Sequence, residues 1–76
     1  MNKQRRKEIQ SIVDQLEELQ GSLEALKEEE EEYQNSIPEN MQGSVRYENA
    51  GEAISCLEDA VSYLNDAICA ATSAIE

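Results

Sequence analysis

The chain has 76 residues, a net charge of −11 and no His, Phe or Trp. A chain of this length forms one domain with a small core, and acid–base chemistry on imidazole is excluded. The charge is uneven, because residues 1–10 carry +3 and the other 66 residues carry −14, so nucleic acid and anionic membranes are repelled and basic protein surfaces are attracted.

The chain starts with the basic segment NKQRRK, and no export signal follows it. In the next segment, EIQSIVDQLEEL, charges interrupt the apolar residues, so the apolar core of a signal peptide is absent. No apolar run approaches the length that crosses a bilayer. The thiols of Cys56 and Cys69 are 13 positions apart on one expected helix, about 20 Å, which is too far for a disulfide. Free thiols suit a reducing compartment, so we expect a cytoplasmic protein.

The first half of the chain shows the heptad pattern of a helix that packs against another helix. Apolar residues recur at alternating spacings of three and four, which predicts a helix over about residues 4–35. The expected inward stripe consists of Ile9, Ile12, Leu16, Leu19, Leu23, Leu26, Glu30, Tyr33 and Ile37. Glu30 is its only polar member.

Acidic residues occupy the outer face of this first helix. A solvated face that keeps the protein soluble is one interpretation. The other is a rod of negative charge that imitates a nucleic-acid backbone and binds a basic groove on a partner. The residues concerned are Asp14, Glu17, Glu18, Glu24, Glu28, Glu31 and Glu32.

Residues 36–44 interrupt the helical pattern and predict a corner. Pro38 lacks an N–H and disfavours helical geometry at the residue before it, so the first helix ends near residue 35 or 36. We expect Pro38 to open a single turn, Gly43 to close it in a left-handed conformation, and the Ser44 hydroxyl to cap the second helix.

Arg46 and Tyr47 stand at the start of the second helix and are among the few non-acidic functional groups beyond the N-terminus. Tyr47 falls on an apolar stripe, so its ring is expected to cap the core near Ile37. Arg46 points away from that stripe and either pairs with Glu39 or Glu48 or contacts a partner.

The second helix is predicted over about residues 45–75. Its stripe, with no charged member, consists of Tyr47, Ala50, Ile54, Leu57, Val61, Leu64, Ile68, Ala71 and Ile75. Small residues also recur every seven positions beside this stripe, which allows another helix to approach closely. We therefore expect an oligomer interface that comprises Ala53, Ala60, Ala67 and Ala74, with Tyr63 as a flanking residue.

The two stripes mirror each other about Gln42, so folding back at the corner sets apolar residues opposite apolar residues. Ile9 then lies opposite Ile75, and Leu16 opposite Ile68. The sequence predicts an all-α protein, a single antiparallel helical hairpin over residues 1–76 that is coiled-coil-like and dimerises into a four-helix bundle. A parallel dimer of one continuous helix is the alternative, and the Pro–Gly corner opposes it.

The corner also carries a resemblance. The segment IPENMQGSVRYENA, followed by an acidic helix rich in Ala and Leu, resembles small uncharacterised proteins of prophages and mobile elements in Gram-positive bacteria. The matching residues are Ile37, Pro38, Glu39, Asn40, Gln42, Gly43, Ser44, Arg46, Tyr47 and Glu48. The resemblance implies a phage-borne accessory protein in the cytoplasm of a host bacterium, and it implies no particular activity.

The sequence offers no catalytic motif. A glycine-rich phosphate loop, paired cysteines for zinc and an activated nucleophile are all missing, so we expect neither an enzyme nor a cofactor. Our first hypothesis is an inhibitor that binds a host defence or nucleic-acid-handling protein without contacting nucleic acid or membrane directly, with Arg46, Tyr47 and the acidic residues as candidate contacts. The sequence leaves open whether the corner, the acidic face or the alanine-lined face binds the partner. The alternative is a self-associating structural hairpin with no inhibitory target.

Overall fold

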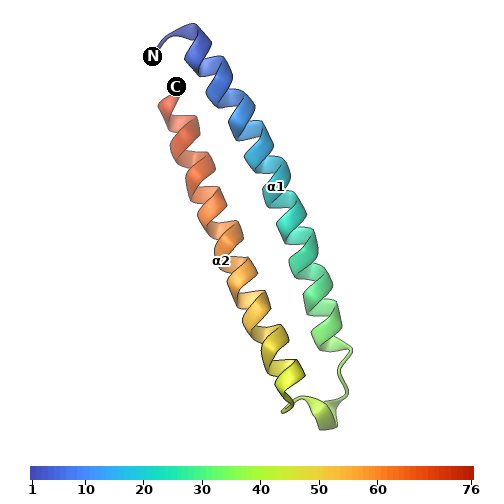
Figure 1. Ribbon diagram of the computed structural model, residues 1–76. Helices are drawn as coiled ribbons and strands as arrows, with labels where there is room; N and C mark the ends of the chain where they lie inside the picture. The colour runs from blue at the N-terminus through green and yellow to red at the C-terminus, as the bar shows by residue number, and fades with distance from the viewer.

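The computed structural model describes residues 1–76 and consists of two long helices joined by a corner. Helix α1 spans Lys3–Asn35, the short 3-10 helix η1 spans Glu39–Met41, and α2 spans Val45–Ala74. The long helices run antiparallel in a rod of 60 × 14 × 13 Å, with both termini at one end and the corner at the other (Figure 1). The predicted all-α helical hairpin is confirmed.

Side-chain caps define where the helices begin. The Asn2 side chain accepts a hydrogen bond from the backbone N–H of Arg5 at 2.8 Å and so starts α1. The Ser44 hydroxyl accepts one from the N–H of Tyr47 at 3.3 Å and starts α2, as predicted. Each cap satisfies a donor that the first helical turn leaves unpaired.

The corner reverses the chain without a left-handed residue, so the expected left-handed conformation of Gly43 is wrong. After Pro38, the N–H of Met41 donates to the Pro38 carbonyl at 2.8 Å, and the N–H of Ser44 donates to the Met41 carbonyl at 3.0 Å. These two successive right-handed turns complete the reversal, so no positive φ is needed at Gly43.

Helix α2 faces α1 with its predicted stripe, whose members are all buried or half-buried. Helix α1 is rotated from the predicted orientation. Four of its nine expected core residues, Ile12, Leu19, Leu26 and Tyr33, are 42 to 58% exposed. The side chains that face α2 are Ile9, Val13, Leu16, Gln20, Leu23, Lys27, Glu30, Gln34 and Ile37. The row that faces α2 in their place starts at Val13 and continues with the polar residues Gln20, Lys27 and Gln34. The apolar row from Ile12 to Tyr33 is therefore left uncovered by α2.

Two glutamines of α1 set the register of the pair. The Gln20 side-chain amide donates to the backbone carbonyl of Val61 at 3.2 Å, and that of Gln34 donates to the carbonyl of Tyr47 at 3.3 Å. Gln34 follows Gln20 by 14 residues and Tyr47 precedes Val61 by 14 residues, so the same contact repeats two heptads further along the rod. At Gly51 an added Cβ would lie 3.1 Å from the Gln34 Nε2 atom, so the absence of a side chain there makes room for that amide.

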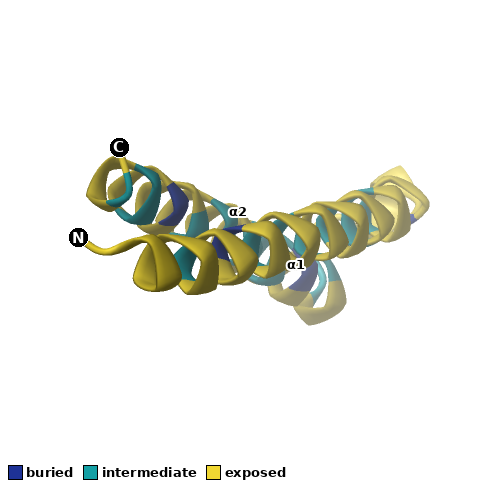
Figure 2. Cartoon of the chain, turned by 90° about the horizontal axis from the view of Figure 1, so that it is seen from above, coloured by how far each residue is buried: buried dark blue, intermediate teal, exposed yellow.

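The interior of the hairpin is thin. Only Val13, Ile37, Ala50 and Ile68 are buried, and most of both helices is exposed along the outside (Figure 2). The single ion pair joins Lys27 Nζ to Glu31 Oε1 at 3.7 Å on α1. Neither helix has the length and apolar character that a membrane span requires.

Candidate functional site

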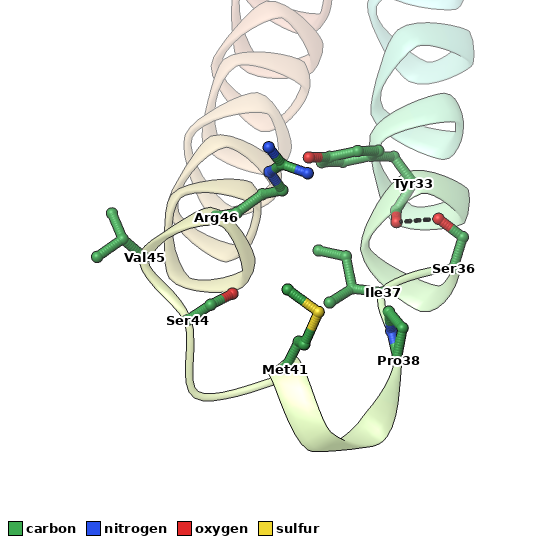
Figure 3. Close-up of a pocket in the computed structure, with 8 residues that line it drawn as sticks. All are labelled: Tyr33, Ser36, Ile37, Pro38, Met41, Ser44, Val45 and Arg46. Carbon is green, nitrogen blue, oxygen red and sulfur yellow. Dashed lines mark hydrogen bonds between the residues drawn. The ribbon is translucent and has the colours of Figure 1, made fainter.

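The corner end of the hairpin carries the one pocket of the structure, with a volume of about 480 Å³. The Tyr33 ring of α1 and the Arg46 guanidinium of α2 point toward each other across its mouth, above Ile37 and Met41 (Figure 3). Val45 points away. The lining residues are Tyr33, Ser36, Ile37, Pro38, Met41, Ser44, Val45 and Arg46.

Arg46 makes no ion pair, so of its two predicted roles the pairing with Glu39 or Glu48 is not formed. Its neighbour Tyr47 is half-buried on the inward side of α2 and does not line the pocket. Tyr47 is tied to the rest of the chain through its backbone, since its N–H donates to Ser44 and its carbonyl accepts from Gln34. Of the two predicted corner residues, only Arg46 is presented at the surface of the pocket.

The acidic residues lie away from Arg46. Glu17, Glu24 and Glu31 recur every seven positions and therefore share one side of α1. Glu31 precedes Tyr33 by two residues, and at about 100° per residue their side chains point roughly 160° apart. We call this the acidic side. Glu17, Glu24 and Glu31 thus lie on one side of α1, and Tyr33, which lines the corner pocket, points away from that side.

The remaining predicted acidic residues extend this charge around α1. Glu18, Glu28 and Glu32 are exposed, and so are Glu17 and Glu24, whereas Glu31 is half-buried beside Lys27. The result is a solvated acidic surface along α1 and not a cluster. No group of three or more His, Cys, Asp or Glu residues is placed to hold a metal ion.

Another side of α1 carries an exposed apolar surface that the sequence pattern had placed in the core. Ile12, Leu19, Leu26 and Tyr33, here called the α1 apolar stripe, were expected in the core and instead face solvent. The apolar pattern gave no signal for this exposure, because the row that faces α2 instead contains Val13 followed by the polar residues Gln20, Lys27 and Gln34.

The alanines that we predicted at an oligomer interface form a row along α2. Ala53 and Ala60 are half-buried, Ala67 and Ala74 are exposed, and Tyr63 beside them is 70% exposed. We call the four alanines the alanine row. Nothing in the chain itself covers them fully. Both cysteines are free and exposed.

Comparisons of the chain with protein-family models, with curated proteins and with solved structures found no match. What the molecule can do is therefore judged from its surfaces. They are an acidic side, an apolar stripe with an alanine row, and a small pocket that holds one unpaired guanidinium.

Proposed function

We propose that this protein is a small acidic inhibitor that binds a host defence or nucleic-acid-handling protein through the acidic side of α1. The observation that carries the proposal is the separation of Glu17, Glu24 and Glu31 from the apolar stripe on the same helix. An acidic surface free of large apolar groups suits a groove lined with Lys and Arg, where attraction is electrostatic and long-ranged.

The charge of the rod supports a partner that ordinarily binds nucleic acid. Eleven net negative charges along 60 Å correspond to about one per 5.5 Å, compared with one per about 1.7 Å along duplex DNA. The hairpin therefore presents about a third of the charge density of a duplex. The resemblance of the corner to prophage-borne proteins supports a bacterial host as the source of the partner.

The test compares two variants that each remove three charges at heptad spacing. Glu17→Gln with Glu24→Gln and Glu31→Gln neutralises the acidic side, and Glu52→Gln with Asp59→Asn and Asp66→Asn neutralises exposed positions on α2. Affinity purification from bacterial lysate, followed by mass spectrometry, should recover a stoichiometric nucleic-acid-handling protein with the parent and with the α2 variant only. Equal recovery with both variants would contradict a role for the acidic side.

The second candidate is a self-associating structural hairpin, and the exposed α1 apolar stripe favours it. We propose in either case that the working form is a homodimer, a four-helix bundle in which a second hairpin covers apolar side chains that the first leaves wet. Recovery of the chain alone from lysate, together with an oligomeric mass in solution, would favour the structural role over inhibition.

A further inference from the structure

We infer that the side of the hairpin formed by the α1 apolar stripe and the alanine row is the contact surface for a second copy of this chain. In this dimer the corner of each copy lies at the open end of the other. The inference rests on the proposal that the chain self-associates, and it adds the surface and the orientation.

The stripe and the row lie on the same side of the rod. Tyr33 is the last member of the stripe, and Arg46 stands one heptad before Ala53, the first member of the row. The Tyr33 ring and the Arg46 guanidinium line the same pocket and point toward each other (Figure 3). Because residues seven apart keep the same face in a packed helix pair, both sets face one way. Large side chains thus follow one edge of this surface and small ones the other.

The exposed surface area of the hairpin is that of a chain which packs against one partner of its own size. The chain exposes 5610 Å², whereas a compact protein of 8.5 kDa exposes about 4,700 Å². The excess of about 900 Å² comes with the elongated shape of the hairpin. Burial of roughly 800 Å² per subunit, as in a dimer interface of standard size, would bring the exposed area of each subunit close to that of a compact protein.

The spacing within this surface is self-complementary. The stripe is symmetric about a point between Leu19 and Leu26, so an antiparallel two-fold axis there pairs Leu19 with Leu26 of the partner subunit, and Ile12 with Tyr33 of the partner subunit. The same operation sets the two alanine rows side by side, where small side chains allow close approach. An isologous contact of this kind closes as a dimer and leaves no free copy of the surface.

Charge along the rod selects the orientation. Residues 3–7 contribute four cations at the open end, whereas Glu28–Glu32 and Glu39 lie in the half toward the corner. With the two corners at opposite ends, each basic end lies beside the acidic half of the other copy. With both corners at one end, like charges would gather at each end of the bundle, which is unfavourable.

The surface is tested by mass in solution. Sedimentation equilibrium of the parent at tens of micromolar should give twice 8.5 kDa, and Leu19→Glu with Leu26→Glu should lower the dimer fraction at least tenfold. The matched control, Ser55→Glu with Ser62→Glu, adds the same charges at the same spacing on the other side of α2 and should remain dimeric. A monomeric parent overturns the self-association proposal itself. A dimer that persists in the Leu19→Glu, Leu26→Glu variant overturns only the surface inferred here.

The orientation is tested by oxidative cross-linking in a Cys56→Ser, Cys69→Ser background, which removes the native thiols. Ser22 lies next to the inferred two-fold axis at the edge of the stripe, so Ser22→Cys should form a covalent dimer within minutes under mild oxidation. Ser62→Cys, on the opposite side, should not. A non-covalent dimer of correct mass whose Ser22→Cys form does not cross-link would overturn the antiparallel arrangement. Because this variant changes only an exposed hydroxyl, its result does not depend on disrupting the fold.

Discussion

At the scale of single residues, the two glutamines that face inward are the most unusual residues between α1 and α2. Gln20 and Gln34 occupy positions at which α1 would otherwise place apolar side chains against α2. Their amides donate to the backbone carbonyls of Val61 and Tyr47, which both lie in helix α2. A hydrogen bond of this type contributes only about 1 kcal/mol. The two amides therefore act more on the register of the two helices than on the stability of the pair.

We therefore expect Gln20→Leu to raise the thermal midpoint. A leucine at this half-buried position buries about as much volume and leaves no donor unsatisfied, and the Val61 carbonyl keeps its helical partner. Circular-dichroism melts at equal concentration measure the change, with Gln15→Leu on the exposed side as the control for added hydrophobicity. A lower midpoint for Gln20→Leu alone would show that the amide bond outweighs apolar burial.

We expect the Tyr47 side chain to stabilise the fold and the Arg46 side chain to contribute little to stability. Removal of the half-buried ring in Tyr47→Ala should cost about 1–2 kcal/mol, or about 5–10 °C in the midpoint of a domain of this size. Val45→Ala, two positions earlier and 70% exposed, serves as the control and should melt like the parent, as should Arg46→Ala. An unchanged midpoint for Tyr47→Ala would mean that its ring does not hold the corner end of the core.

At the scale of the helix, the two elements differ in how far their packing follows from sequence. On α2 a single stripe of apolar residues runs from Tyr47 to Ile75, so its inward face was predicted correctly. On α1 the apolar spacing favours the row of Ile12 beside the row that starts at Ile9, because the row of Val13 continues with polar residues. The structure nevertheless turns the Val13 row toward α2. The choice depends on the shape of α2 and on where the Gln20 and Gln34 amides find acceptors, which is information from the other helix.

Glycines in the two helices give a matched pair of substitutions. Gly21 is exposed within α1, and an added Cβ meets nothing within 4 Å, whereas at Gly51 in α2 it meets the Gln34 amide at 3.1 Å. Gly21→Ala should raise the free energy of unfolding by about 0.5–1 kcal/mol through helix propensity. Gly51→Ala should gain less, because Gln34 must move away from the Tyr47 carbonyl. Urea denaturation of both variants checks this order, and an equal gain would show that the Gln34 contact is dispensable.

At the scale of the whole molecule, the sequence predicted the kinds of surface and not their arrangement. The acidic character of Glu17, Glu24 and Glu31 and the alanine row were both visible in the sequence. Their separation onto different sides, and the exposure of the α1 apolar stripe beside the row, depend on the rotation of α1 about its axis. The sequence did not distinguish the corner, the acidic face and the alanine-lined face as binding surfaces, and the structure places Arg46 at the corner pocket beside Tyr33.

The uneven charge predicts a stability that rises with ionic strength. Raising NaCl from 0.01 to 1 M shortens the screening length from about 30 to about 3 Å, which weakens the repulsion among the excess carboxylates. The thermal midpoint should therefore increase. The Glu17→Gln, Glu24→Gln, Glu31→Gln variant carries less of this repulsion and should respond less to salt. A midpoint that falls with salt would indicate that the attraction between basic and acidic segments dominates.

The placement of both termini at one end of the rod, described with the fold, has a mechanical consequence. A force applied between the two ends of the chain pulls α1 and α2 apart one layer at a time, beginning near Ile9 and Ile75 and ending at the corner. Layers that are loaded one after another resist a much smaller force than layers that are loaded all at once. All layers would be loaded at once if the two helices were pulled in opposite directions along the rod. An unfolding enzyme that pulls on one terminus would therefore separate the two helices progressively from their open end. A second copy bound along the side of the hairpin would be the main source of resistance.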